Sequence, residues 1–567
     1  MSTQEQTIRT LPPRRAVLRV GIAAAGSGLL AGCSGSAQNP AHRDGAQGPA
    51  HARSAQDPDG GAAASPGATS PERPARGLTL TAAPGTVELG AGRTARTWTY
   101  NDELPGREVR VTAGDTLRLT LNNHLPDPTT VHWHGVAVRN DMDGVPNVTQ
   151  PPIRAGASFT YRFRVPHPGT YWFHPHLGLQ LDRGLYAPLI VDDPDEPLSY
   201  DREWVIVLDD WIDGIDGLSP GDVFARLRKG RPAPGHGVRQ GHQDGHGARE
   251  GSDRPSLPRG GVDAGYGPAR DDGPEPRDRT SSTSPYGGEA PRTGRQTGSE
   301  LLGGHTGDVD YPHYLVNGRI SADPSQFSAR PGERIRLRII NAAADTPFRV
   351  ALGGHRLTIT HSDGFPVQHE TVDSVLLGMA ERYDALVTVK GGVFPFTALA
   401  EGKRGAGMAV LRAGRAAAPK PSARPAELYR DVLVSARRLS PHESVALDRR
   451  RPDRQLKITL TGGMERFDWG IDHRPYSPDR IHRVERGERV RLVVVNATDM
   501  WHPVHLHGHT YALAGIGSRG ARKDTSVVLP HRKLVCDLDA DNPGLWMLHC
   551  HNVYHSESGM MTTLGYR

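Results

Sequence analysis

Cysteine is scarce in this chain, which has only three cysteines among 567 residues. A fold of this length cannot depend on a dense framework of disulfides, so each cysteine needs its own explanation. The apolar run from Val20 to Ala31 is too short to cross a bilayer as a helix. The net charge is only +5 and the basic residues are scattered, so nothing favours binding to nucleic acid.

Histidine, by contrast, is abundant, with 27 residues, and eight of them form four His-x-His pairs. A single pair is weak evidence, because such pairs more often belong to surface or loop chemistry. Four pairs, one of which encloses a cysteine, are not expected by chance. The pairs are His132 with His134, His174 with His176, His505 with His507, and His549 with His551.

The segment near the C-terminus combines two kinds of metal ligand. A thiolate, two imidazoles and a distant thioether form the ligand set of a blue-copper electron-transfer centre, here Cys550, His502, His555 and Met560. Alternate side chains of a strand point to opposite faces, so His549 and His551 face away from Cys550 and need a second metal site. One short segment thus joins an electron-accepting copper to a neighbouring metal cluster, which indicates an oxidase.

Internal repeats indicate the fold. Three segments, each a turn followed by an alternating β-branched and basic strand, share one pattern: Ala113–Asn122, Pro331–Asn341 and Arg486–Asn496. A second repeat pairs Pro168–His176 with Pro543–His551. We therefore predict three copies of one β-domain and an all-β chain.

The middle copy lacks the metal ligands. Where the last copy has His502, His505 and His507, the middle copy has Phe348, Ala351 and Gly353. The first copy keeps its paired histidines but has Pro175, Gln180 and Leu185 at the positions of Cys550, His555 and Met560. We expect the blue copper in the last domain alone and the histidine cluster at the interface of the first and last domains. The middle domain is interpreted as a spacer.

Together these motifs resemble those of the three-domain multicopper oxidases, similar to bacterial laccases and to the spore-coat and copper-efflux oxidases. The resemblance covers residues 77–567 apart from one insertion. It implies three cupredoxin-like Greek-key β-sandwich domains. We place them at 77–195, 196–420 and 421–567, with the low-complexity insertion, about 230–298, in the middle domain.

The resemblance also implies four copper ions and a ligand set for each. Type 1 copper takes His502, Cys550, His555 and axial Met560; type 2 takes His132 and His505; the type 3 pair takes His134, His174 and His551 on one ion and His176, His507 and His549 on the other. Electrons enter across the edge of His555 and leave through Cys550, and the three clustered coppers reduce dioxygen to two waters. The enzyme is then a laccase-like oxidoreductase.

Asp143 is the predicted catalytic acid. It lies 11 residues after His132, where related bacterial oxidases carry an aspartate that supplies protons beside the type 2 and type 3 coppers. The alternative is an ordinary turn, because Asp-Gly is also a good turn dipeptide. Some relatives have a glutamate directly after the position of His555, but this chain has Ser556 there, which leaves the role of Glu557 open.

Residues 1–32 resemble a twin-arginine export signal, with Arg14 and Arg15 ahead of the apolar run. The segment ends at Cys33 in a pattern similar to a bacterial lipoprotein box. We expect an extracytoplasmic protein, lipid-anchored to the outer face of the cell membrane through Cys33 and a flexible tether over 33–76. The alternative is cleavage and full secretion. Cys536 has neither a lipid nor a copper assigned to it, and we interpret it as a buried structural thiol.

The insertion is rich in Gly, Arg, Asp and Pro and poor in apolar residues, which is typical of disorder. We interpret it as a passive linker. The alternative is a weak, exposed copper site formed by His236, His242 and His246.

Four functional readings are compared. An electron carrier would leave eight histidines unexplained, and a metal-free relative would show substituted ligands. A two-domain nitrite reductase lacks the third domain. We therefore predict an oxidase that couples one-electron oxidation of phenolic or aromatic donors to four-electron reduction of dioxygen to water. The alternative donors are Cu(I), Fe(II) or Mn(II) in copper tolerance, and the oligomeric state and redox potential stay open.

Overall fold

The chain folds almost entirely into β-strands. The computed structural model describes residues 76–229, 298–514 and 519–567. Within these ranges the helices are short: α1 (Pro220–Leu227), α2 (Val553–Ser558), η1 (Asn140–Met142), η2 (Leu181–Arg183), η3 (Glu300–Leu302), η4 (Ala426–Tyr429), η5 (Ala436–Arg438) and η6 (Glu443–Val445). The expected export signal, the Cys33 lipidation site, nearly all of the tether and nearly all of the insertion lie outside the described residues.

The first pair of sheets follows residue 76. One sheet has the order β2-β1-β4-β6, made of β2 (Arg93–Tyr100), β1 (Arg76–Gly90), β4 (Thr116–Asn123) and β6 (Ser158–Arg164). The other has the order β3-β8-β7-β5, made of β3 (Val109–Thr112), β8 (Ala187–Asp192), β7 (Gly169–His174) and β5 (His132–His134). Trp133 of β5 packs on Phe163 of β6, with ring centroids 5.0 Å apart, so the two sheets share one apolar core.

The second pair is the largest. Its seven-stranded sheet runs β11 (Arg319–Ile320), β10 (His313–Val316), β9 (Arg202–Trp211), β13 (Arg334–Asn341), β18 (Arg382–Thr388), β15 (Leu357–Ser362) and β16 (Phe365–Val372). Its six-stranded sheet runs β12 (Gln326–Ser328), β20 (Ala406–Ala413), β19 (Gly392–Ala400), β14 (Phe348–Leu352), β17 (Ser374–Leu377) and β21 (Val432–Leu433). The pairing of β21 with β17 carries this sheet past residue 420, where we placed the domain boundary from the sequence.

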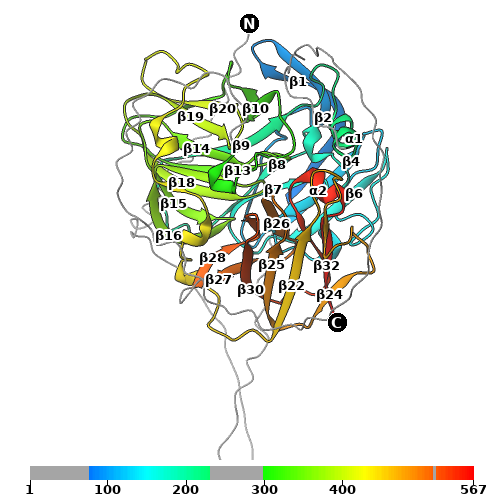
Figure 1. Cartoon of the computed structure of the whole chain (residues 1–567). Coiled ribbons are helices and arrows are strands. Elements are labelled where there is room, and N and C mark those ends of the chain that lie inside the picture. The colour runs from blue at the N-terminus through cyan, green and yellow to red at the C-terminus, as the bar shows by residue number, and fades with distance from the viewer. Residues whose placement is uncertain (1–75, 230–297, 515–518) are drawn as a thin grey trace, which may run out of the picture.

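The third pair contains the C-terminus. Its first sheet runs β23 (Gly470–Ile471), β22 (Arg454–Thr461), β25 (Arg489–Asn496), β30 (Lys533–Asp539), β27 (Tyr511–Ala514) and β28 (Arg519–Lys523). Its second sheet runs β24 (Ile481–Val484), β32 (Met561–Tyr566), β31 (Leu545–Cys550), β26 (His502–Leu506) and β29 (Thr525–Val528). Figure 1 shows the three pairs as blue-to-cyan, green-to-yellow and orange-to-red groups.

The three repeated sequence segments occupy the same place in the three pairs. β4, β13 and β25 each pair in parallel with the strand that opens the unit, namely β1, β9 and β22. Each also pairs antiparallel with one later strand, namely β6, β18 and β30. In β4 and β25 the alternation of apolar and polar residues fits this place, because one face of each strand lies on the core. β13 differs, because both of its faces are buried from residue 335 onward.

The strands that carry the histidine motifs also share one register. His132 of β5 lies opposite His174 of β7, and His505 of β26 lies opposite His549 of β31. In the middle unit the equivalent pair is Ala351 of β14 opposite Thr397 of β19. The same backbone arrangement therefore brings two imidazoles together in the first and last units and none at this position in the middle unit.

The fold class predicted from the sequence, all-β, is confirmed. Three pairs of sheets with crossover pairing match the expectation of Greek-key sandwiches. The exact domain boundaries remain predictions. Among the described residues, no helix combines the length and the apolar composition that crossing a bilayer requires.

Candidate metal centre

A thiol and two imidazoles meet at the end of β31. The Sγ atom of Cys550 lies 3.6 Å from Nδ1 of His502 and 3.6 Å from Nδ1 of His555, and these two nitrogens are 3.0 Å apart. All three side chains are fully buried. Met560 is buried beside them, and its main chain hydrogen-bonds to both Cys550 and His555. The two imidazoles and the thiol form a group that could hold one metal ion.

Two polar side chains orient these imidazoles. The Nε2 atom of His502 lies 2.8 Å from Oγ1 of Thr498, and Nε2 of His555 lies 2.7 Å from Oδ2 of Asp308. With Nε2 engaged in each ring, Nδ1 faces Cys550. Burial lowers the pKa of His502 well below its ordinary value and that of His555 to about 3, so both rings are neutral at pH 7 and each has a lone pair for a metal.

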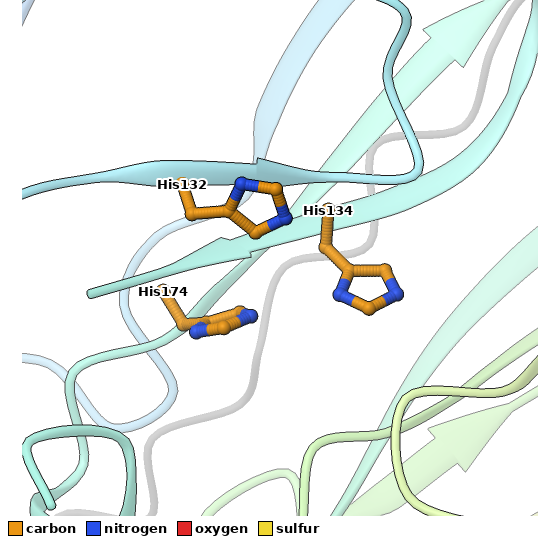
Figure 2. Close-up of side chains that lie close together, drawn as sticks. All are labelled: His132, His134 and His174. Carbon is orange, nitrogen blue, oxygen red and sulfur yellow. The ribbon is translucent and has the colours of Figure 1, made fainter. Parts of the chain in front are cut away.

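The eight histidines of the four pairs form a second group. β5 holds both histidines of the first pair, whereas β7, β26 and β31 each hold the first histidine of a pair and end before the second. Figure 2 shows the rings of His132, His134 and His174 gathered together. Seven of the eight are buried and His176 is half-buried. Triads with ligand atoms within 4.8 Å are His132, His134 and His174; His132, His505 and His507; and His176, His507 and His549.

Backbone carbonyl groups select the tautomer of four of these rings. A carbonyl oxygen only accepts, so the Nδ1 atom that contacts it carries the proton, and Nε2 is left with its lone pair. The contacts between Nδ1 and a backbone oxygen are His132 with Asp143 (3.0 Å), His174 with Pro175 (2.9 Å), His505 with Asp524 (3.0 Å) and His549 with Cys550 (2.9 Å). In His132, His174 and His505 the Nε2 atom has no hydrogen-bond partner among the described residues.

His134 is turned the other way. Its Nε2 atom lies 3.1 Å from Oδ1 of Asp524 and 3.1 Å from Oγ1 of Thr525, and its Nδ1 atom has no partner within the described ranges. His551 has no partner at either nitrogen in the same ranges. Its ring lies 5.0 Å from that of His134 and 5.2 Å from that of His174. Buried nitrogen atoms without partners are costly unless a metal or another ligand uses them.

A buried carboxylate joins histidines of the first and last units. Oδ1 of Asp143 lies 3.1 Å from Nδ1 of His132, and Oδ2 lies 2.9 Å from Nδ1 of His507. The Nε2 atom of His507 then lies 3.1 Å from Nε2 of His549, which is also 3.3 Å from Nε2 of His176. Asp143 is completely buried, so an exposed turn does not describe its surroundings.

Most imidazole rings of this histidine group are uncharged at neutral pH, which suits them to bind a cation. Burial first, and then the neighbouring imidazoles, hold the pKa of six rings well below the ordinary value: His134, His174, His176, His507, His549 and His551. Neutral imidazoles with convergent lone pairs are ligands for copper, zinc, iron and nickel, and the thiol of the first group favours Cu(I) in particular. The donor sets therefore fit copper.

Comparison with known proteins decides between these metals. Three models, each described as "Multicopper oxidase", match residues 81–196, 294–416 and 449–567. This chain belongs to the multicopper oxidase family. It is therefore a copper-binding oxidoreductase, and the family resemblance noted from the sequence is confirmed.

Individual relatives agree with this assignment. The chain is 45% identical to "Multicopper oxidase MmcO" of Mycobacterium tuberculosis, over 89% of this chain and 91% of the relative. It is 28% identical to "Copper resistance protein A" of Escherichia coli, over 83% of this chain and 89% of the relative. The crystal structure of the laccase from Botrytis aclada has the same fold, with a TM-score of 0.65, 22% identity and 88% of each chain covered.

Motif analysis missed three polar residues that contact the histidines of this multicopper oxidase's metal centre: Thr498, Asp308 and Asp524. They lie in no recognisable motif, and Asp308 is 247 positions from the histidine that it contacts. Nothing in the spacing of the sequence could have found them. Glu557, whose role the sequence left open, is exposed on the surface.

Proposed function

We propose that this multicopper oxidase couples the oxidation of a one-electron donor beside His555 to the reduction of dioxygen to water. The observation that carries this proposal is the segment His549–His551. Its cysteine lies in the group with His502, while the histidine on one side lies against His507 and the one on the other side lies against His134. Three consecutive residues thus connect two metal-binding groups, as an oxidase with separate donor and oxygen sites requires.

The proposed ligands follow the assignment given above from family resemblance. Type 1 copper would be held by His502, Cys550, His555 and Met560, type 2 copper by His132 and His505, and the type 3 pair by His134, His174 and His551 together with His176, His507 and His549. Four copper ions held there would supply one-electron storage at four places, which matches the four electrons that dioxygen needs. The triad of His176, His507 and His549 coincides with one proposed type 3 set.

We propose that Asp143 supplies protons for the formation of water. Its two carboxylate oxygens contact Nδ1 of His132 and Nδ1 of His507, so it lies directly behind rings from two domains. Carboxylates in such positions act as general acids and bases. Asp143 is completely buried, so bulk water does not contact this carboxylate directly.

The donor that we propose is a small cation such as Cu(I), which is the alternative named from the sequence. His555 is completely buried, and its Nε2 edge is covered by the carboxylate of Asp308. Burial raises the pKa of Asp308 to about 7, so this carboxyl group is partly ionised at neutral pH, and its ionised form attracts a metal ion. A phenol ring finds no exposed imidazole edge to contact. The likeness to a protein named "Copper resistance protein A" supports the same donor. Phenolic oxidation, our first prediction from the sequence, is the competing outcome of the test.

Oxygen uptake by the copper-loaded protein tests both the oxidase function and the identity of the donor. We expect faster, saturable uptake with Cu(I) than with a methoxyphenol. A clear preference for the methoxyphenol would replace the metal donor by an organic one and leave the oxidase function standing. No uptake with either donor, on protein that holds four coppers per chain, would contradict the oxidase function itself.

We also propose that the chain is exported and lipid-anchored through Cys33, because the residues around it are similar to a lipoprotein box. Full secretion is the alternative. Mass spectrometry of the mature N-terminus, together with Cys33→Ala, tests this. We expect a lipid-modified Cys33 at the mature N-terminus in the membrane fraction and no lipid on the variant; an unmodified Cys33 would contradict the proposal.

A further inference from the structure

Arg382, at the start of β18 in the middle unit, contacts both of the other units. Its Nη1 and Nη2 atoms donate to Oδ1 and Oδ2 of Asp524 at 2.7 and 2.6 Å. Its Nε atom donates to the backbone oxygen of Thr170 at 3.2 Å. Arg382 and Asp524 are completely buried. A buried guanidinium therefore lies where all three units meet.

Asp524 in turn contacts two rings of the histidine group. Its Oδ1 atom lies 3.1 Å from Nε2 of His134, and its backbone oxygen accepts from Nδ1 of His505 at 3.0 Å. These contacts leave Nδ1 of His134 and Nε2 of His505 without partners among the described residues. One residue thus sets which nitrogen atom each of these two rings presents, and the rings come from different domains.

The middle unit fixes the same segment at further points. Oδ2 of Asp363 accepts from the backbone N–H groups of Asp524 and Thr525, both at 3.2 Å. The Nζ atom of Lys523 forms ion pairs with Oδ2 of Asp363 and Oε1 of Glu381, both at 3.1 Å. All of these side chains are buried. The segment that holds the two rings is therefore fixed by the middle unit through both side chains and backbone.

The glycine after the first histidine pair shows how closely these groups pack. Gly135 has φ +81°, which favours glycine, and a Cβ atom there would lie 2.4 Å from Nη2 of Arg382 and 2.5 Å from Oδ2 of Asp524. No side chain fits at this position. The backbone beside His134 consequently lies directly on the Arg382–Asp524 pair.

We propose that Arg382 is a positioning residue for the trinuclear copper site, although it lies in the domain that supplies none of the ligands. It holds the carboxylate of Asp524 in a two-point contact, and Asp524 orients His134 and His505. A guanidinium makes such a contact in one fixed geometry, whereas a lysine ammonium cannot. The middle domain is then more than a spacer. This inference rests on the proposed assignment of the histidine ligands.

The test compares Arg382→Lys with a matched control in the same sheet. Arg336 of β13 is also buried, and it makes two hydrogen bonds to Asp384, at 2.6 and 3.0 Å. Neither Arg336 nor Asp384 hydrogen-bonds to any of the eight histidines within the described residues. Arg336→Lys therefore removes a similar buried contact that reaches none of the eight histidines, although Asp384 also accepts from Oγ1 of Thr170 at 2.7 Å. Both variants are prepared as full-length, copper-loaded protein.

The readouts separate the two copper sites. Copper content is measured after dialysis against graded chelator, the type 2 signal by electron paramagnetic resonance, and the type 1 site by its blue absorption. For Arg382→Lys we expect cluster copper to be held about 10-fold more weakly, the low end of the loss seen when a residue in contact with a ligand is replaced, because Arg382 acts through Asp524. The blue absorption should persist. Arg336→Lys should match the unsubstituted protein in both signals.

Three results would overturn the role of Arg382: unchanged cluster copper in Arg382→Lys, equal loss in both variants, or loss of the blue absorption along with the cluster signal. If Arg382→Lys does not fold, Arg382→Gln takes its place, because it keeps an amide donor for Asp524 and leaves Asp524 itself unchanged, and Arg336→Gln is then the control. Arg382→Gln should fold and still lose cluster copper, whereas Arg336→Gln should keep it. A cluster signal missing from the unsubstituted protein would instead contradict the proposed ligand assignment.

Discussion

The Oδ2 atom of Asp308 lies 2.7 Å from Nε2 of His555, and both side chains are completely buried. Asp308 belongs to the segment that follows the insertion in the middle unit, and His555 belongs to α2 of the last unit. The carboxylate therefore covers the Nε2 edge of this imidazole, and neither side chain is exposed to solvent.

Asp308→Asn should therefore discriminate between donors. The amide keeps the shape of the side chain but loses its charge, which removes the attraction for a metal ion. Because hydrogen bonds to charged groups contribute about 1.5–3 kcal/mol, we expect kcat/KM for Cu(I) to fall by about 10- to 100-fold. Oxygen uptake measures this effect. Asp310→Asn, which changes a partly exposed neighbour, is the control, and equal losses for Cu(I) and a methoxyphenol would contradict a charge effect.

Asp143→Asn should slow the reduction of dioxygen in enzyme that holds all its copper. Proton transfer by a positioned carboxylate is worth about 10²- to 10⁴-fold in rate, so we expect kcat per copper-loaded enzyme to fall within that range. The blue absorption should be unchanged, while cluster copper is measured alongside kcat because Asp143 contacts the rings of His132 and His507. Asp141→Asn, two residues away with a side chain 57% exposed, serves as control. An unchanged kcat in Asp143→Asn would exclude the proton role.

The two cysteines of the described residues should respond differently to the same replacement. Both are buried, and burial raises the pKa of both thiols. Only Cys550 lies beside two imidazoles, whereas Cys536 of β30 contacts the backbone oxygen of Leu492. We expect Cys550→Ser to abolish the blue absorption and oxygen uptake, and Cys536→Ser to keep both. Loss of the blue colour in Cys536→Ser would contradict the assignment.

Acid should weaken the middle unit through Asp384. Burial opposes its ionisation, but Arg336 and Arg338 outweigh burial and lower its pKa from 3.8 to about 2. The carboxylate therefore stabilises the fold above pH about 4, and this contribution is lost as pH falls toward about 2. Removing one partner of such a buried ion pair costs about 3–5 kcal/mol, so we expect Asp384→Asn to lower the melting temperature at neutral pH.

Calorimetry of the copper-free protein checks this pH dependence. The gap in melting temperature between the unsubstituted protein and Asp384→Asn should narrow as pH decreases, because both then carry a neutral side chain at this position. A gap that stays constant down to pH about 2 would show that the charge of Asp384 does not contribute.

The proposed copper ligands could be named from the sequence because they occur in short motifs. His-x-His pairs, a cysteine between two histidines and repeated strand segments are local patterns, and strand geometry alone separates Cys550 from His549 and His551. The repeat also predicted the all-β fold, since the same alternation recurs in β4, β13 and β25. Asp143 was named by its spacing from His132, although spacing does not show that it also contacts His507.

The partners of those ligands were decided by tertiary structure alone. Asp308, Asp524 and Arg382 carry no motif, and each acts on a residue of another unit or of a distant strand. Their contacts depend on how three sandwiches pack against one another, which no local pattern encodes. The sequence by itself determined which side chains can bind copper, because ligand chemistry is a property of residue type and spacing. Only the packed chain decided which nitrogen atoms they present and what covers His555, because these depend on contacts between residues far apart in the chain.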